Sequence, residues 1–202
     1  MAKVRDKEAT RARIVKAALK EFVEKGYEGT TISRIARRAR LSKQLLSHHF
    51  PTKERLFQEV HDLRFRDPVG EIPPSSATDL FAQRFRLRAQ DVDYVRFLTW
   101  EAASVRSSKV PGREARLRRI IDKGSTIRRF QARGEIPPHL DHKLMQLAIT
   151  SLATYPLAFG QITQLITGRD PIDAQFQEDW YRFLQAIGRM LFEQADNGAP
   201  GD

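Results

Sequence analysis

Apolar residues recur every three or four positions along most of the chain, which is the repeat of a helix that packs on one side. Over residues 10–25, for example, Ile14, Ala18 and Phe22 fall in one row. The same spacing, rather than the alternation of a strand, continues in six later segments, at residues 53–65, 78–89, 91–107, 113–133, 140–167 and 172–194. The pattern therefore predicts an all-α protein.

The segment 67–76 interrupts this pattern. Its three prolines and one glycine cannot continue a helix, so we interpret it as the joint between two domains, residues 1–66 and 77–202. Residues 3–13 are basic and show no apolar repeat, and we expect a frayed arm there. At 202 residues the chain is long enough to bury a real core.

Two short helices joined by a tight turn are expected within residues 30–53. The first has an apolar face of two isoleucines and two alanines, with four arginines on its other faces or just beyond it. Ser42 is placed to cap the second, residues 43–50, whose Leu46 and Phe50 lie four apart on an inner face. A helix-turn-helix of this kind places its second helix in the major groove of DNA, where each base pair shows a distinct pattern of donors and acceptors.

The residues in and around this helix pair also carry a family resemblance. Between about residues 10 and 60 they include, in one register and without gaps, Gly26-Tyr27, Thr30-Thr31-Ile32, Ile35-Ala36, Ala39, Ser42-Lys43, Leu46, Phe50-Pro51 and Lys53-Glu54. This stretch resembles the DNA-binding domain of the TetR family of bacterial transcriptional regulators. The chain departs from the family at Arg40, where the turn often has glycine, and at Gln44, Leu45 and Ser47, which replace the usual small residue, Thr and Tyr.

The start of the second short helix provides the candidate base contacts. Lys43, Gln44 and Leu45 occupy its exposed first turn, where lysine can donate to guanine, glutamine can pair with adenine and leucine can pack on a thymine methyl group. Six further side chains are placed for phosphates, which set register rather than specificity: Thr31, Arg34, Ser47, His48, His49 and Lys53. The alternative for the threonine is a helix cap alone, whereas the lysine follows from the resemblance, because the family's fourth helix starts at a phosphate.

The pair His48 and His49 suggests a dependence on pH. Unperturbed imidazole titrates near pH 6.5, and a neighbouring phosphate favours its charged form. DNA affinity should then strengthen as the pH falls from about 8 to 6. The alternative is that one of the two rings packs against the first helix and stays neutral.

The chain is strongly basic, with a formal net charge of +10, and the excess is concentrated in the first third. Residues 1–66 hold 17 Lys and Arg against 8 Asp and Glu, whereas residues 67–202 hold 18 against 17. Clustered cations bind a phosphate backbone favourably because binding releases the condensed counterions of the phosphates. This distribution therefore favours a polyanion partner over a merely solvated basic surface. The charged start, the absence of a long apolar run and the absence of cysteine predict a cytoplasmic protein without disulfides.

The second domain is the expected place for a small-molecule effector, because the resembled family holds its ligand there. Candidate lining residues are aromatic and polar side chains from separate predicted helices: Phe97, Trp100, Glu101, Ser104, Phe130, Thr150, Tyr155 and Phe159. Residues 106–133 are locally basic, and a solvated helix face is favoured there over an anionic ligand. Pro156 interrupts the segment 140–167 and is expected to kink it.

The two long apolar segments at the C-terminus resemble the helix pair with which TetR proteins form a dimer. The expected dimer interface consists of nine apolar residues: Phe159, Ile162, Leu165, Phe176, Trp180, Phe183, Leu184, Ile187 and Leu191. The alternative is that these helices only complete the core of their own domain.

No catalytic arrangement is recognisable. The sequence contains no Ser-His-Asp arrangement, glycine-rich phosphate loop or paired carboxylates in a plausible context, so we expect neither enzyme activity nor a cofactor. His139, Asp141 and His142 have a spacing that could hold a metal, but an aspartate near the positive end of a helix is the plainer interpretation, and no metal is expected.

These features predict an all-helical, ligand-responsive regulator that binds a palindromic DNA operator as a homodimer and is released by a small molecule. Repression is the commoner mode in the resembled family. The alternative is a DNA-binding adaptor whose C-terminal domain recruits a protein partner without a ligand. A void within residues 78–170 would favour the regulator, and a filled core with an exposed apolar patch would favour the adaptor.

Overall fold

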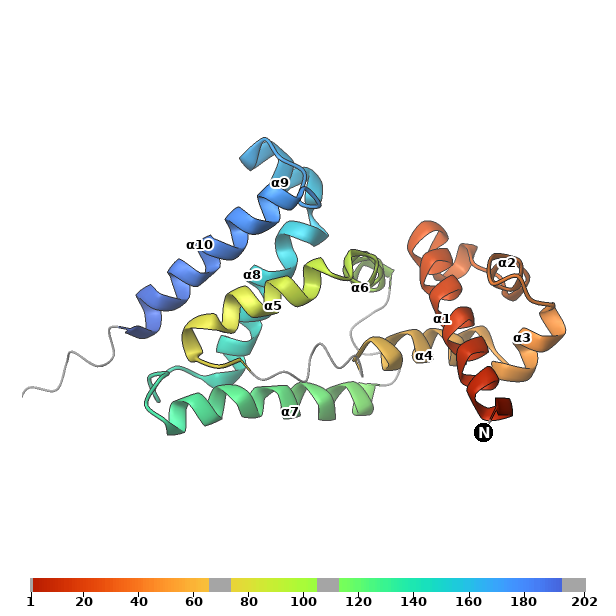
Figure 1. The fold of residues 1–202 in the computed structure, drawn as a ribbon, viewed down its shortest axis with the longest axis horizontal. Helices are drawn as coiled ribbons and strands as arrows, with labels where there is room; N and C mark the ends of the chain where they lie inside the picture. The colour runs from red at the N-terminus through yellow and green to blue at the C-terminus, as the bar shows by residue number, and fades with distance from the viewer. Residues whose placement is uncertain (1, 66–73, 105–112, 194–202) are drawn as a thin grey trace, which may run out of the picture. The chain divides into compact units, whose positions relative to one another are not determined.

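The computed structural model describes residues 2–65, 74–104 and 113–193, and this part of the chain is helical without a strand (Figure 1). None of the described helices is long and apolar enough to cross a membrane. The all-α prediction is confirmed. In chain order the elements are α1 (Ala2–Gly29), α2 (Ile32–Arg38), α3 (Lys43–His49), α4 (Lys53–Phe65), the short 3-10 helix η2 (Ala77–Asp79), α5 (Leu80–Ala89), α6 (Val92–Ser104), α7 (Arg113–Ala132), α8 (His142–Ala158), α9 (Gly160–Thr167) and α10 (Ala174–Phe192).

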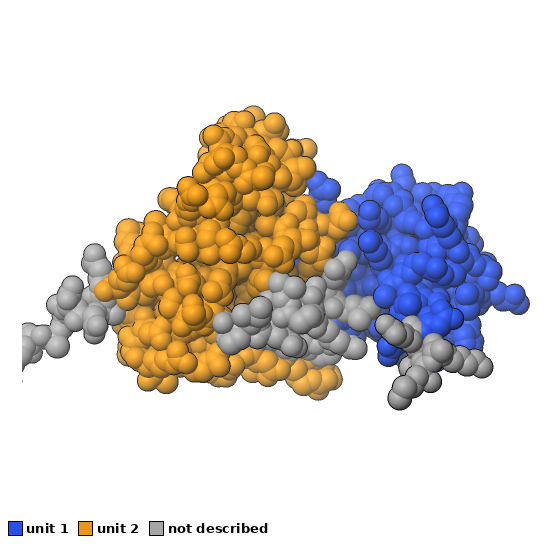
Figure 2. Space-filling model, viewed as in Figure 1, with its two compact units in different colours: residues 1–67, 96–112 blue, residues 68–95, 113–202 orange. Residues whose placement is uncertain are grey.

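The helices divide between two compact units (Figure 2). The first unit comprises residues 1–67 and 96–112, and the second comprises residues 68–95 and 113–202. This division differs from the expected one in a single respect, because α6 is shared and its part from Arg96 onwards belongs to the first unit.

The core of the first unit explains why it includes part of α6. Ile14, Ala18 and Phe22, the predicted row of α1, are fully buried. The ring of Phe22 meets that of Phe57 from α4 edge-on at 5.1 Å, and the fully buried Phe97 of α6 lies 5.0 Å from Phe57. Aromatic rings at these separations attract one another beyond their buried area. The second half of α6 is therefore part of the core of the first unit.

Helix α1 begins at Ala2, so the frayed arm expected over residues 3–13 is wrong. The segment is rich in lysine, arginine, glutamate and alanine, which all favour helix. Arg11 also fixes it to the rest of the unit. Its Nη2 lies 2.7 Å from Oε2 of Glu59, and its guanidinium lies 4.5 Å from the centre of the Phe50 ring.

Helix α1 changes direction at Gly26, where φ is +69°. Glycine enters this left-handed region without steric cost, as expected for the predicted end of the first helix. A Cβ atom at this position would lie only 2.6 Å from Nε1 of Trp100, so packing also excludes a side chain. Both the backbone and its neighbour therefore require glycine here.

The second unit is built around α5, which packs against α8 and α10. Its buried core includes Phe85, Ile149, Ala153 and Leu184, which are contributed by these three helices. Helix α10 approaches η2 so closely that a Cβ atom at Gly188 would collide with the backbone carbonyl of Thr78. Helix α10 can approach η2 this closely because Gly188 has no side chain.

Pro156 interrupts the predicted helix 140–167, as expected. Proline has no N–H, so the carbonyl of Leu152 loses its partner in the helix. The indole Nε1 of Trp180 donates to this carbonyl instead, at 3.3 Å. Helix α8 ends soon after the proline, and Phe159, with φ −115° and ψ 54°, separates it from α9.

Candidate nucleic-acid interface

The predicted helix-turn-helix is formed by α2 and α3, and capping side chains start both helices. Oγ1 of Thr31 accepts a hydrogen bond from the backbone N–H of Arg34 at 3.3 Å, and Oγ of Ser42 accepts one from Leu45 at 3.1 Å. Each cap satisfies a backbone donor that the helix itself leaves free. Both short helices therefore begin where the sequence predicts.

The turn between α2 and α3 is closed by two backbone hydrogen bonds. The N–H of Arg40 donates to the carbonyl of Arg37 at 3.1 Å, and that of Leu41 donates to the carbonyl of Ala36 at 2.9 Å. Arg40 has a φ of +54°, in the left-handed region that costs an ordinary residue about 1–2 kcal/mol. The turn thus keeps its geometry without the glycine that is frequent in the resembled family.

The helix pair separates a buried face from an exposed one. Ile35 and Leu46 are fully buried on the inner face. Lys43 and Gln44 are exposed, and the side chain of Leu45 is 40% exposed. The three predicted base contacts thus lie together on the solvent side of the first turn of α3, with one ammonium donor, one amide and one apolar side chain.

A buried carboxylate joins α2 to α1. Glu21 is almost inaccessible, and its carboxylate accepts hydrogen bonds from Nε of Arg34 at 3.0 Å and from Nε of Arg38 at 2.7 Å. Burial alone would raise the pKa of Glu21, but the hydrogen bonds and charges of the two arginines outweigh it and hold the pKa below its ordinary value. Arg34 thus joins α2 to α1 through its Nε, while its side chain remains 38% exposed, and the predicted phosphate contact stays a prediction.

Lys53 has a similar internal role. Its Nζ donates to the backbone carbonyls of Tyr27 at 2.8 Å and of Thr30 at 3.2 Å, and it lies 4.1 Å from the centre of the Tyr27 ring. Two of its three N–H donors are therefore used to hold the end of α1 against the start of α4. One donor remains for a phosphate, so the family-based expectation of a phosphate contact stays a prediction.

The two histidines at the end of α3 differ in their surroundings. His48 is exposed, whereas His49 is partly buried and its Nδ1 is buried without a hydrogen-bond partner. Burial lowers the pKa of His49, and the charges of His48, Lys7 and Arg11 lower it further. These surroundings favour the alternative of a neutral, packed ring for His49, whereas the exposed His48 stays a predicted phosphate contact.

Arg37 and Arg40 are candidate phosphate contacts that the helical spacing does not identify. Both are exposed and neither forms an ion pair with a described residue, whereas Arg34 and Arg38 of the same region are engaged by carboxylates. Of the other predicted phosphate contacts, Thr31 is exposed and Ser47 is partly buried. Arg37 and Arg40 are recognised as available cations because no described carboxylate pairs with them, and the local sequence pattern cannot reveal this.

Residues 14–60, which include the whole helix-turn-helix, match the family model of bacterial regulatory proteins, tetR family. The chain belongs to the TetR family. It is 28% identical over 166 residues to the HTH-type transcriptional repressor SCO4008 of Streptomyces coelicolor, a match that covers 81% of this chain and 86% of that protein. This TetR-family chain is thus a DNA-binding transcriptional regulator rather than an enzyme.

Solved structures of regulators share the fold over nearly the whole chain. The crystal structure of SCO4942 from Streptomyces coelicolor has a TM-score of 0.71 at 24% identity and covers 91% of this chain and 98% of that chain. The transcriptional regulator FadR from Bacillus subtilis, solved in complex with stearoyl-CoA, has a TM-score of 0.66 at 17% identity and covers 87% of this chain and 97% of that chain. The two-part helical architecture is therefore shared with other regulators.

The predicted effector residues of this TetR-family chain are divided between the two units. The first unit holds Phe97, Trp100, Glu101 and Ser104, and the second holds Phe130, Thr150, Tyr155 and Phe159. Glu101 is buried, with Oε1 at 2.9 Å from Nε2 of His61, so its carboxylate is engaged in the first unit. Phe130 is buried in the core of the second unit, whereas Tyr155 is 48% exposed and packs on the exposed Phe159.

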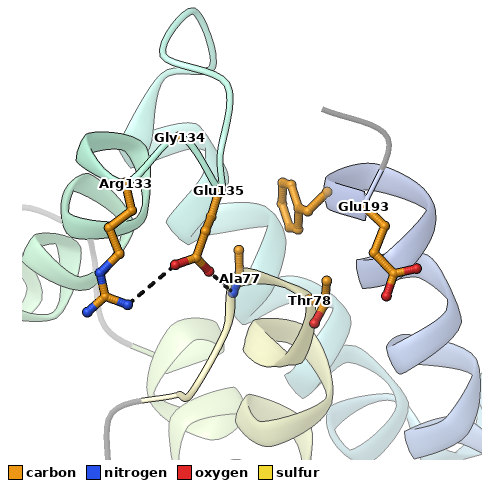
Figure 3. Close-up of a pocket in the computed structure, with 7 residues that line it drawn as sticks. Ala77, Thr78, Arg133, Gly134, Glu135 and Glu193 are labelled. Carbon is orange, nitrogen blue, oxygen red and sulfur yellow. Dashed lines mark hydrogen bonds and ion pairs between the residues drawn. The ribbon is translucent and has the colours of Figure 1, made fainter. Parts of the chain in front are cut away.

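A hollow of about 320 Å³ opens elsewhere in the second unit, between η2, the turn after α7 and the end of α10 (Figure 3). The carboxylate of Glu135 accepts a hydrogen bond from the backbone N–H of Ala77 at 3.0 Å and lies 3.3 Å from Nη1 of Arg133. The charged groups at one side of the hollow thus neutralise each other and join η2 to the turn. None of the eight predicted effector residues lines it.

The predicted dimer residues lie on α9 and α10, except Phe159, which separates α8 from α9, and most of them reach the surface. Phe176 and Leu184 are exceptions, because the inner edge of α10 buries them inside their own unit, and their assignment to an interface is corrected. The other seven are exposed or partly exposed: Phe159, Ile162, Leu165, Trp180, Phe183, Ile187 and Leu191.

The possible metal position at the start of α8 is a helix cap. The carboxylate of Asp141 accepts hydrogen bonds from the backbone N–H groups of Lys143 at 2.8 Å and Leu144 at 3.0 Å. These bonds, that of Leu144 first, lower the pKa of Asp141. Among the described residues no group of three histidine, aspartate or glutamate side chains is arranged to hold a metal ion.

Proposed function

We propose that this TetR-family regulator is a repressor that binds a palindromic operator as a homodimer and is released by a small molecule. In this proposal residues 1–66 bind DNA, and residues 77–202 bind the effector and form the dimer. The observation that carries the DNA-binding part is the exposed group Lys43, Gln44 and Leu45 at the start of α3, which a buried inner face holds in place. A twofold dimer would present two such helices to half-sites about 34–36 Å apart, or a multiple of this distance.

The homodimer is supported by apolar surface that the chain leaves uncovered on its last three helices. Leu165 is 82% exposed and Ile166 of the same helix is 75% exposed. Exposed apolar residues continue along α8 and α10, with Leu144 and Leu147 on the former and Phe183, Met190 and Leu191 on the latter. Apolar surface of this extent marks an interface in a protein without membrane-spanning helices among its described residues.

Repression and release by an effector are supported by proteins similar to this chain. The relative SCO4008 is named a repressor, and FadR, a neighbour in fold, was solved with stearoyl-CoA. A ligand releases DNA only if it binds the released state more tightly than the DNA-bound state. The small molecule is therefore proposed to act through a difference in affinity between two arrangements of the protein.

The base-reading part can be tested by selecting the preferred site from randomised duplex DNA and measuring its affinity. Gln44→Ala should weaken binding to the selected site by about tenfold or more, because one bidentate base contact decides about 1–3 kcal/mol, and should leave binding to unrelated DNA unchanged. Gln90→Ala is the matched control, since Gln90 is an exposed glutamine of the second unit. An equal loss on both kinds of DNA would show that Gln44 does not read bases.

The dimer can be tested by sedimentation velocity. Leu165→Asp should convert a dimer into a monomer, because it places a charge in the proposed apolar interface. Leu117→Asp is the control, since Leu117 of α7 is 45% exposed but lies outside that interface. A dimer that persists in Leu165→Asp would contradict the proposed interface.

A further inference from the structure

Two arginines lie one turn apart on the same side of α5, within the second unit. Arg84 and Arg88 are four residues apart and therefore project from one face of the helix. Both are partly buried, and they adjoin Phe81 and Phe85, which belong to the buried core. The helix thus carries two positive charges at the edge of an apolar core.

Neither arginine has a counterion among the described residues. None of the ion pairs formed by the described residues involves Arg84 or Arg88. Nε of Arg88 is buried without a hydrogen-bond partner, and the guanidinium lies 5.7 Å from the centre of the Tyr94 ring. Burial lowers the pKa of Arg84 to about 10, with a further contribution from the charge of Arg88. Among the described residues, the charge that lowers the pKa of the partly buried Arg84 is thus that of a second cation, which repels it.

The rest of the chain shows how partly buried arginines are normally accommodated in this fold. Arg34 is engaged by the carboxylate of Glu21, and Arg11 is paired with Glu59. Even the exposed Arg133, beside the hollow of Figure 3, is paired with Glu135. A buried guanidinium without a hydrogen-bonding anion costs stability, so an unpaired set is expected where a group from outside completes it.

We propose that Arg84 and Arg88 form the anion-binding end of the effector site, and that the effector is an organic molecule with a carboxylate or phosphate group. Guanidinium groups hold such oxyanions by paired, charge-assisted hydrogen bonds in a fixed planar geometry. The apolar residues beside them suit a hydrocarbon part better than a fully hydrated inorganic ion. This inference rests on the proposed release by a small molecule and gives that molecule its chemical class.

The first test uses the stability of the full chain without any ligand. Arg84→Met keeps most of the side-chain volume and removes an uncompensated charge, so it should raise Tm by about 2–4 °C. Arg86→Met is the matched control, because Arg86 is exposed and stacks on the Tyr181 ring at 3.8 Å, and its replacement should not raise Tm. A lower Tm in Arg84→Met would show a structural arginine and would overturn the inference.

The second test measures ligand-induced stabilisation with three probes that share one tail: octanoate, octyl phosphate and octanol. At a hundredfold excess over Kd, octanoate or octyl phosphate should raise Tm of wild type and of Arg86→Met by about 5–10 °C, and octanol should not. Arg84→Met and Arg88→Met should lose this response, and the stronger of the two anions identifies the head group. Equal stabilisation by octanol, no stabilisation by either anion, or an unchanged response in the two variants would overturn the inference.

Measuring DNA release separately keeps this inference distinguishable from the proposed function. If octanoate stabilises the protein through Arg84 but leaves the operator complex intact, the anion site stands and the release mechanism fails. If a neutral molecule releases DNA equally from wild type and from Arg84→Met, the release mechanism stands and the anion site is overturned.

Discussion

Replacing Glu21 by glutamine would show how much its buried carboxylate stabilises the junction of α1 and α2. Its side chain is 4% exposed and accepts hydrogen bonds from Arg34 and Arg38, whose side chains are 38% and 31% exposed. A hydrogen bond to a charged group contributes about 1.5–3 kcal/mol, and solvent around the two arginines reduces this. We expect Glu21→Gln to lower the free energy of unfolding of the first unit by about 2 kcal/mol.

The loss should depend on pH in a defined direction. The pKa of Glu21 lies below its ordinary value of 4.5, because the hydrogen bonds and charges of Arg34 and Arg38 outweigh the effect of burial. A carboxyl group whose pKa is lower in the folded state stabilises fully above its unfolded pKa and loses this contribution as the pH falls through its folded pKa. The difference between wild type and Glu21→Gln should therefore be constant near neutral pH and shrink below pH 4.5.

The chain offers a reporter for each unit, because it has two tryptophans, Trp100 in the first unit and Trp180 in the second. In a Trp180→Phe background, urea unfolding followed by the fluorescence of Trp100 reports the first unit alone. Glu28→Gln is the control, since Glu28 is exposed and forms no ion pair with a described residue. Equal losses in the two glutamine variants, or a difference that persists unchanged to about pH 3, would refute the reasoning.

Three further predictions concern single positions. Arg40→Gly should stabilise the first unit by about 0.5–1 kcal/mol in urea unfolding, since glycine relieves the left-handed backbone at φ +54° but loses more chain entropy; destabilisation would contradict the strain. Gly188→Ala should cost about 2–3 kcal/mol in calorimetry, because its Cβ atom meets the Thr78 carbonyl, and an unchanged Tm would disprove this close approach. As the pH falls from about 8 to 6, operator affinity measured by fluorescence anisotropy should rise in wild type and in His49→Gln but not in His48→Gln. The reason is that the lowered pKa of His49 keeps its ring neutral. Loss of this pH dependence only in His49→Gln would reverse the assignment.

The helix-turn-helix could be predicted from sequence because its determinants are local. The apolar face containing Ile35 and the capping positions Thr31 and Ser42 lie within a few residues of the helices they define. The exposed first turn of α3, with Lys43 and Gln44, follows directly from this register. Local spacing is enough where a short segment decides its own conformation.

The contacts that the sequence did not predict join side chains to partners that lie far away in the chain. Arg34 resembles a free surface cation until Glu21, thirteen residues earlier, is seen to engage it, and Lys53 donates to the carbonyl of Tyr27, twenty-six residues earlier. Periodicity also marks the whole apolar stripe of α10 without showing that Leu184 faces its own core. Tertiary packing, rather than local pattern, decides these roles.

Whether α3 reads DNA sequence can be tested by binding the purified protein to a genomic DNA library and sequencing the retained fragments at two salt concentrations. A palindromic site should be enriched, and its affinity should fall steeply as salt rises, because the exposed Arg37 and Arg40 are proposed to contact phosphates. Retention that depends on salt but shows no sequence preference would contradict the base-reading roles of Lys43 and Gln44 and favour a DNA-binding adaptor.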